Sequence, residues 1–283
     1  MFNNKLIESI ATASDPASLR LSPSDWRLVL DANAQFTEGE TDWKGSAEYG
    51  KYLLRKIGSA AKDLDFRNSL ELCCGNGFLF FSLSPLRAFD DSSHFIDLSE
   101  RQCNDFLRRC EKAGITPPSI KCADISSLPY DAESLQLVYG HSFLHHLPDV
   151  PAYLAEISRV LRKKGRFIAF HEPTPTAPWM ETFPLSVLKE VTQDSLTDIW
   201  LLRPNVVERL FQEAGFERVE IHFHNLAASF LVSPWQVLRD KFKRSRNSTG
   251  MLKARILCDR LDKLLPNRLL RRFAPSISIV AVK

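Results

Sequence analysis

The amino-acid sequence predicts an α/β protein in which helices cover both faces of a mostly parallel, doubly wound sheet. Between Ser69 and His224, short apolar runs alternate with segments of helical periodicity, which is the pattern of βαβ units. Glycines also occur where helices of such units end: Gly114 and Gly215 follow the last residues of two expected helices. The chain has 283 residues, of which 44% are apolar and 25% charged, enough to form a sizeable core.

The expected elements follow in chain order. Strands are expected at Ser69–Cys73, Ser93–Asp97, Ser119–Cys122, Leu135–Gly140, Arg166–His171 and Glu217–His224. Helices are expected between them at Phe78–Ser84, Glu100–Ala113, Val150–Leu161 and Pro204–Ala214. Apolar residues at a spacing of three or four predict one more helix over Ala47–Leu64, and the alternating run Ser276–Val282 predicts a closing strand. We therefore divide the chain into a helical cap (1–65), a core (66–232), a helical insertion (233–275) and the closing strand (276–283).

Composition excludes several classes of protein. No stretch approaches the roughly 18 consecutive apolar residues that a membrane span requires. The first ten residues include Lys5 and Glu8, so no secretory leader is expected. The six cysteines contain no C-x-x-C pair, and we expect buried thiols in a reducing cytosol rather than disulfides or a zinc site.

A glycine-containing loop follows the first strand. In Cys73-Cys74-Gly75-Asn76-Gly77 two glycines stand one residue apart before an expected helix, so the main chain can turn tightly and meet a ligand directly. A dinucleotide fingerprint needs a third glycine, and Phe80 occupies that position. A tight βα turn without a ligand is the alternative. Two acids follow later strands: Asp97 is placed for ribose hydroxyls, and Asp124 for an adenine amino group.

With these motifs in order, and with the later segment Phe143–Asp149, the chain resembles the class I methyltransferases, in particular the ubiquinone and menaquinone branch. The resemblance covers about Leu70–Val219, and the closing strand extends it. It implies a seven-stranded, Rossmann-like sheet with an antiparallel closing strand, and methyl transfer from S-adenosylmethionine with S-adenosylhomocysteine as product. It departs from the family at Cys73, where the first loop glycine is expected, and at Leu135-Gln136.

The resemblance also implies which residues bind the cofactor. These are Glu71, Cys73, Gly75, Gly77, Asp97, Leu98, Asp124, Ile125 and Gly140, with His141 near the methyl group. No metal constellation is present in the sequence, and metal dependence is not expected.

Methyl transfer needs aligned reactants, and a hydroxyl acceptor also benefits from a general base. His141 leaves the fourth expected strand, and His171 and Glu172 leave the fifth, at the strand ends where open α/β sheets bind ligands. We rank His141 first as the base and keep His171 and Glu172 as alternatives or substrate-binding groups. Pocket lining is the alternative role for His141, and His145 and His146 are expected to be structural. His222 and His224 are expected on the sheet surface.

Aromatic residues outside the sheet are candidates for the walls of an acceptor pocket. They are Phe36, Trp43, Tyr49, Trp179 and Trp200, together with Met180. Ordinary helix packing explains them equally well.

The insertion is strongly basic. Residues 239–272 contain twelve Lys/Arg and three Asp, a net charge of +9, while the whole chain carries +3. A solvated helical face, an anionic membrane surface and RNA all explain such a segment. We favour the membrane over nucleic acid, because leucines rather than stacking aromatic residues accompany the charges.

Three functions therefore remain open. The first is methylation of a small-molecule or lipid-linked acceptor, most simply at a hydroxyl oxygen, by a cytoplasmic or membrane-associated enzyme. The second is RNA or protein methylation, which the strand end Tyr139-Gly140-His141-Ser142 does not favour. The third is a cofactor-binding fold without transfer activity. The sequence leaves the acceptor and the oligomeric state undetermined.

Overall fold

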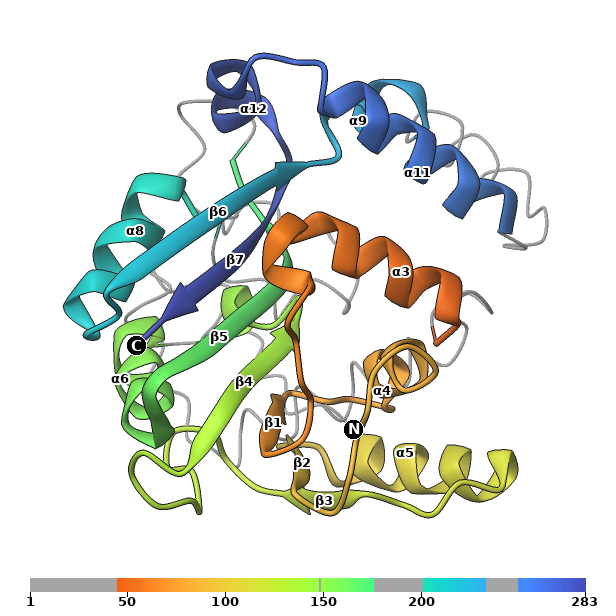
Figure 1. The fold of residues 1–283 in the computed structure, drawn as a ribbon, viewed down its shortest axis with the longest axis vertical. Coiled ribbons are helices and arrows are strands. Elements are labelled where there is room, and N and C mark those ends of the chain that lie inside the picture. The colour runs from red at the N-terminus through yellow and green to blue at the C-terminus, as the bar shows by residue number, and fades with distance from the viewer. Residues whose placement is uncertain (1–44, 148, 176–200, 233–248) are drawn as a thin grey trace, which may run out of the picture.

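The protein forms one seven-stranded sheet. The computed structural model describes residues 45–147, 149–175, 201–232 and 249–283, and their strands follow the order β3-β2-β1-β4-β5-β7-β6 (Figure 1). The strands are β1 (Ser69–Leu72), β2 (Ser93–Asp97), β3 (Ser119–Cys122), β4 (Leu135–His141), β5 (Leu161–Pro173), β6 (Arg218–His224) and β7 (Ser276–Val282). Only β7 runs antiparallel to its neighbours. The predicted fold class, including the antiparallel closing strand, is confirmed.

Helices lie on both faces of this sheet (Figure 1). They are α3 (Ala47–Lys56), η2 (Gly58–Ala61), α4 (Phe78–Leu83), α5 (Glu100–Ala113), η3 (Leu144–His146), α6 (Val150–Val160), α8 (Pro204–Glu213), α9 (Leu226–Leu231), α11 (Thr249–Asp262) and α12 (Asn267–Phe273). One core joins α6 and α8 to the sheet. The other face packs against α3 and α4, and α5 extends it near β2.

Side chains that point alternately to the two faces of each strand explain why there are two cores. In β1, Leu70 and Leu72 enter the α6–α8 core, while Glu71 between them points to the opposite face. In β4, Val138 joins the α6–α8 core, and Tyr139 joins the α3–α4 core. Since both faces are covered, the ligand-binding edge is the one where the parallel strands end.

The bounds of β2, β3, β7 and α5 agree with the prediction, and those of β4, β6, α4, α6 and α8 differ from it by one residue. Three further differences have local reasons. The helix expected over 47–64 ends at Lys56, because Gly58 has a φ of +56° and a short 3₁₀ turn follows. Strand β1 ends before Cys73, which has a φ of +51°. Strand β5 begins at Leu161, and the predicted turn lies within it, where Lys164 has a φ of +61°.

Several expectations lie outside the described residues. They concern the cap before residue 45 with Phe36 and Trp43, the aromatic candidates Trp179, Met180 and Trp200, and the basic residues of 233–248.

The prediction that all cysteines are buried is wrong for two of them. Cys122 is exposed on the edge strand β3, and Cys73 is half-buried in the loop after β1, while the other four are buried and all six are free. Among the described residues, no helix combines the length and the apolar character that a bilayer crossing requires.

Candidate functional site

The loop between β1 and α4 depends on its glycines. Gly77 has a φ of +75°, and a Cβ at this position would lie 2.2 Å from Cδ2 of Phe106, so no side chain fits there. Gly75 also has a positive φ, of +54°, but a Cβ there would meet only Oε1 of Gln102, at 3.8 Å. Bare main chain therefore faces open space at Gly75, which leaves room for a ligand.

Asp97 connects this loop to the end of β2. Its Oδ2 accepts a hydrogen bond from the Gly75 N–H at 2.8 Å, and its Oδ1 accepts one from the Ser99 N–H at 2.8 Å. The Ala123 N–H donates to the Asp97 carbonyl at 2.9 Å, which holds the segment before Asp124 against the end of β2. The loop, Asp97 and Asp124 thus meet at one edge of the sheet. A carboxylate oxygen accepts more than one hydrogen bond, so these contacts are compatible with ribose hydroxyls.

Four acidic residues act electrostatically on the Cys73 thiol. Burial raises the pKa of Cys73 well above its usual value, and the charges of Asp97, Glu172, Asp124 and Glu71 raise it further. Glu71 is only 2% exposed, and burial raises its pKa as well. Among the described residues its Oε2 makes no hydrogen bond of good geometry, although the Tyr139 hydroxyl lies close enough to lower the pKa of this carboxyl group. Such an acceptor beside the glycine loop fits a ligand that brings N–H or O–H donors.

These observations fit S-adenosylmethionine, whose ribose hydroxyls and ammonium group are such donors. Leu98 is half-buried beside Asp97, as a residue flanking an adenine would be. Ile125 differs, because its side chain is buried in the α6–α8 core and leaves only its main chain for the cofactor. Gly140 has a packing role, since a Cβ there would lie 2.7 Å from the Phe143 ring.

His141, at the end of β4, is held by three aromatic neighbours. Its Nε2 lies 2.8 Å from the Tyr49 hydroxyl, which comes from α3. The Phe78 ring meets the imidazole edge-to-face, with 4.9 Å between centroids. His171 stacks on it at 5.6 Å with an interplanar angle of 12°. The two histidines predicted from different strand ends are therefore neighbours, and the side chain of His141 is fixed in position.

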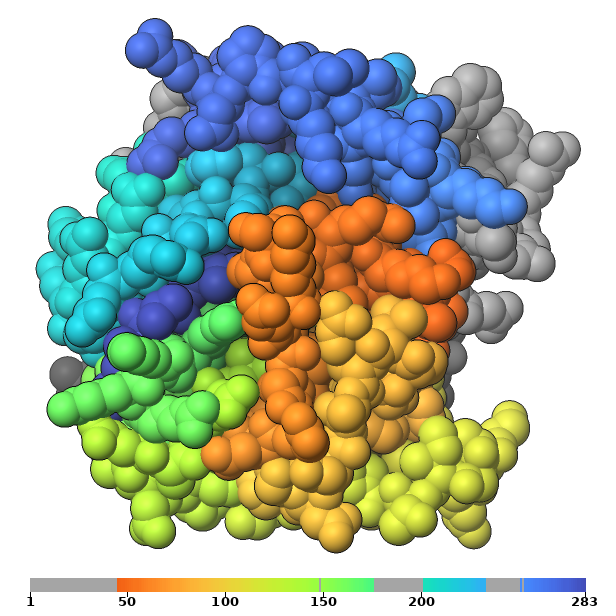
Figure 2. Space-filling model, viewed as in Figure 1, coloured from red at the N-terminus to blue at the C-terminus, as the bar shows by residue number. Residues whose placement is uncertain are grey.

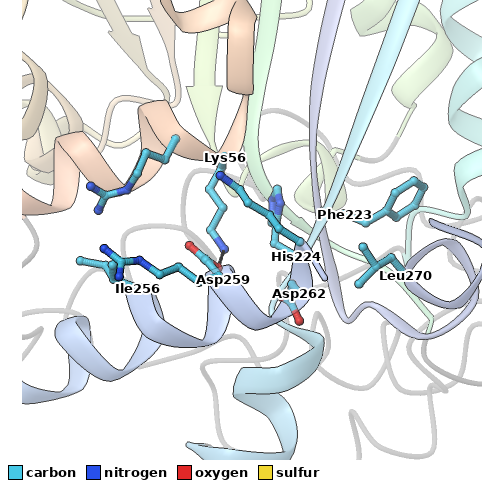
Figure 3. Close-up of a pocket in the computed structure, with 10 residues that line it drawn as sticks. Lys56, Phe223, His224, Ile256, Asp259, Asp262 and Leu270 are labelled. Carbon is cyan, nitrogen blue, oxygen red and sulfur yellow. Dashed lines mark hydrogen bonds and ion pairs between the residues drawn. The ribbon is translucent and has the colours of Figure 1, made fainter. Parts of the chain in front are cut away.

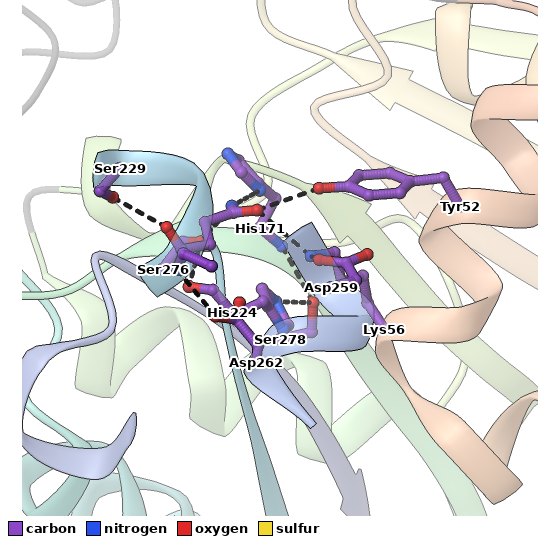
Figure 4. A network of polar contacts seen from close by, with 11 residues as sticks. Tyr52, Lys56, His171, His224, Ser229, Asp259, Asp262, Ser276 and Ser278 are labelled. Atoms are coloured by element: carbon purple, nitrogen blue, oxygen red, sulfur yellow. Dashed lines mark hydrogen bonds and ion pairs between the residues drawn. The ribbon is translucent and has the colours of Figure 1, made fainter. Parts of the chain in front are cut away.

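A polar network continues from His171 towards α11 (Figure 4). Nδ1 of His171 lies 3.5 Å from Nδ2 of Asn225. The Asn225 side chain donates to Oγ of Ser276 at 2.6 Å, and its Oδ1 accepts from the Tyr52 hydroxyl at 3.0 Å and from Nζ of Lys56 at 3.2 Å. Asn225 thus links three chain segments behind the two site histidines.

The strand order, the glycine loop and the acids at the strand ends agree with the comparisons. The methyltransferase domain family matches residues 70–169. These residues therefore match a methyltransferase domain, and they carry β1 to β4 and most of β5 of the sheet. The chain is 30% identical over 145 residues to an uncharacterized chloroplastic methyltransferase of Arabidopsis thaliana, a match covering 46% of this chain and 40% of the relative.

Two further likenesses extend this result. A demethylmenaquinone methyltransferase of Lactococcus lactis is 28% identical over 177 residues, covering 57% of this chain and 70% of the relative. The phosphoethanolamine N-methyltransferase 2 of Haemonchus contortus, solved with S-adenosylmethionine, shares the fold with a TM-score of 0.61 at 14% identity. That likeness covers 98% of this chain and 60% of the other. The chain therefore spans between two fifths and seven tenths of these relatives.

Glu172, just beyond the matched residues, stabilises a turn, and its contacts contradict the prediction that it could act as a base. The residue is fully buried. Its Oε1 accepts from the N–H groups of Phe143 and Leu144 at 2.9 and 3.1 Å. Its Oε2 lies 2.7 Å from Nδ1 of His145 and accepts from the His145 N–H at 3.4 Å. A carboxylate with this many donors fixes the η3 turn after β4, which positions the segment next to His141. His145 has the structural role predicted for it.

A pocket of about 180 Å³ lies beyond the polar network, between α3, α11 and the end of β6 (Figure 3). Lys56 and Asp259 form a buried ion pair in its wall. Burial lowers the pKa of Lys56 to about 8 despite this acid, and burial likewise raises the pKa of Asp259. His224 also lines it, and the prediction that this histidine lies on the sheet surface is wrong, because it is 3% exposed and bonded to Ser278 at 3.0 Å.

The sequence did not single out several of these groups. Tyr49 was expected only as a possible wall of the pocket, and its hydrogen bond to His141 depends on how α3 crosses the sheet. Asn225 and Lys56 belong to no motif, and the two residues are 169 positions apart in the chain. The sequence offers one signal, because Asn tolerates a positive φ and therefore often marks a turn. Asn225 has a φ of +70°.

Proposed function

We propose that the chain transfers the methyl group of S-adenosylmethionine to a hydroxyl oxygen of a small-molecule or lipid-linked acceptor. The observation that carries this proposal is the hydrogen bond between Tyr49 and His141, at the strand end next to the glycine loop. This contact supports a role for the His141 imidazole as proton acceptor, at the edge of the sheet that also carries the candidate cofactor residues. The demethylmenaquinone methyltransferase among the relatives supports a small-molecule acceptor.

In this mechanism the cofactor, when bound, supplies an electrophilic methyl group. The residues of the chain hold the reactants in line, exclude water and remove one proton. When the His141 ring carries its proton on Nδ1, Nε2 accepts a hydrogen bond from Tyr49. The proton of the acceptor hydroxyl then reaches Nε2 through the Tyr49 hydroxyl, or directly after Tyr49 has turned away. His171 keeps the imidazole plane in place by stacking.

The division of the chain is part of the proposal. The cap contributes α3, which carries Tyr49, and the insertion contributes α11, which closes the pocket next to α3. Cap and insertion then act on the acceptor, while the core binds the cofactor. Methylation of RNA or protein, or cofactor binding without transfer, are the alternatives to this division of roles.

The proposal is tested in two steps. Isothermal titration with S-adenosylmethionine and with S-adenosylhomocysteine measures cofactor binding, and failure of both to bind would contradict the cofactor assignment. Turnover with a labelled methyl donor is then measured against extracted lipids, extracted small molecules, RNA and protein. Label in lipid or small-molecule fractions supports the proposal, and label only in RNA or protein contradicts it.

A variant pair tests the base. His141→Ala should lower turnover about 10²-fold or more, the contribution typical of a general base, while cofactor affinity stays near that of the wild type. His222→Ala, on the half-buried part of β6, is the matched control and should leave turnover unchanged. Equal turnover for His141→Ala and the wild type would remove His141 from the mechanism.

A further inference from the structure

Exposed apolar side chains gather on one side of the protein. Nine large apolar residues are exposed in the described part of the chain, and seven of these lie on or directly after α9, α11 and α12. They are Phe230, Leu231, Leu257, Leu261, Leu264, Leu269 and Phe273. We call this surface the α9–α12 face, and α11 and α12 form a continuous part of the molecular surface in Figure 2 (blue).

These apolar side chains are strongly exposed, and three of them follow the spacing of a helix. Leu264 is 81% exposed and Phe230 74%. Leu257, Leu261 and Leu264 are spaced by four and three residues, so they form one stripe along α11 and the turn that follows it. Helix α9 packs against α11 through Ala228, Val232 and Cys258, which places the end of α9 beside this helix.

The charges of the same face have one sign. Residues 249–275 contain seven Lys/Arg and two Asp. Both acids point inward: Asp262 is 3% exposed and accepts from the Ala227 N–H at 2.8 Å, and Asp259 pairs with Lys56. The exposed charges of these residues are therefore cationic, namely Lys253, Arg260, Lys263, Arg268, Arg271 and Arg272. Of these, Arg271 is paired with Glu208 of α8 at 3.0 Å, and the other five carry the positive charge of the face.

We propose that the α9–α12 face docks on an anionic lipid bilayer. Exposed leucines and phenylalanines beside lysines and arginines are the arrangement that binds the interface of a bilayer, where the apolar side chains enter the acyl region and the cations meet lipid phosphates. This proposal goes beyond methyl transfer and does not depend on it.

Two other occupants fit this face less well. RNA would use the cations but would leave the leucine stripe in contact with water. A second copy of the chain would cover the leucines but would bring two cationic faces together, at a cost from repulsion between like charges. The bilayer satisfies both features at once.

The test is flotation of the full-length chain with vesicles of phosphatidylcholine alone or phosphatidylcholine mixed with phosphatidylserine. We expect binding to the mixed vesicles, weaker binding at high salt, and little binding to the neutral ones. Absence of binding to the mixed vesicles would overturn the proposal.

Two variant sets separate the apolar and the charged contributions. Leu257→Ser, Leu261→Ser and Leu264→Ser together should lower binding more than about tenfold, while Leu107→Ser, an exposed leucine of α5, should leave it unchanged. Lys253→Gln with Lys263→Gln should lower binding by about fivefold for each cation, and Lys112→Gln on α5 is the control.

Cofactor titration shows that each variant is folded. Vesicle binding unaffected by the leucine set would overturn the proposal. So would a dimer, found by light scattering, that the leucine set dissociates, because a second copy would then be the occupant.

Discussion

Replacing Glu172 by Gln separates a structural from a catalytic role for this buried carboxylate. The substitution keeps the shape of the side chain but replaces one acceptor oxygen with an NH₂ group. The oxygen that remains can still accept from Phe143 and Leu144, as Oε1 does now. The NH₂ group would face two donors of His145, where Oε2 now lies 2.7 Å from Nδ1.

The expected loss of folding stability in Glu172→Gln follows from these contacts. A hydrogen bond to a charged group contributes about 1.5–3 kcal/mol, and one short contact of this kind is lost. The two bonds that remain weaken because the charge is gone. A change of the His145 tautomer, which lets Nδ1 accept from the new amide, recovers part of this loss. We therefore expect the free energy of unfolding to fall by about 2–4 kcal/mol.

Urea denaturation of the wild type and of Glu172→Gln measures this loss, with Glu213→Gln on the surface of α8 as control. The control should change stability by less than about 0.5 kcal/mol. Under conditions where Glu172→Gln is fully folded, its turnover should stay within about tenfold of the wild type. Normal stability combined with a loss of turnover as large as that of His141→Ala would refute the structural role and restore Glu172 as a base.

Three further predictions concern the site and its surroundings. Tyr49→Phe should lower kcat about tenfold and shift the pH profile, with cofactor affinity unchanged, because the site histidine loses its partner; an unaltered profile would exclude Tyr49 from proton transfer. Gly77→Ala should destabilise the fold by about 2–4 kcal/mol and weaken cofactor binding, since its Cβ would meet Phe106 at 2.2 Å and its φ is positive. Gly114→Ala, with a positive φ but open space, should cost only about 1–2 kcal/mol. Lys56→Met should cost about 3–5 kcal/mol by leaving a buried acid unpaired, and it should also change the pH dependence of stability. The folded protein holds the Lys56 proton less tightly than the unfolded chain does, with a pKa of about 8 against 10.5. The free energy of unfolding therefore rises with pH across this window in the wild type, and urea titrations of Lys56→Met should lack that rise.

The sequence predicted the sheet well because its signals are local. Apolar runs between turn residues identified β2 and β7 to the residue, and Gly114 marked the end of α5 at Ala113. The loop with Gly75 and Gly77 was found for the same reason, since its spacing is visible within five residues. Local signals also misled, because the helical periodicity continued past Gly58 although the helix ends before it.

Side-chain roles were harder to predict because they depend on distant contacts. Glu172 and His171 are adjacent in sequence at the end of β5. In the structure the first is buried among the donors of the η3 turn, and the second stacks on His141. Adjacent residues of a strand point to opposite faces, and the register shift of β5 against β7 between Ala169 and Glu172, where His171 has a φ of +60°, interrupts the regular alternation. No pattern in the sequence marks that register shift.

The cysteine in the glycine loop has a consequence for the chemistry next to it. A thiolate is a strong nucleophile, and one placed beside a methylsulfonium donor would compete with the acceptor and alkylate the protein itself. Burial and the acids around Cys73 keep its proton in place, so the sulfur stays a poor nucleophile. With a cationic methyl donor bound in this loop, the same acids would thereby protect the protein from methylating itself.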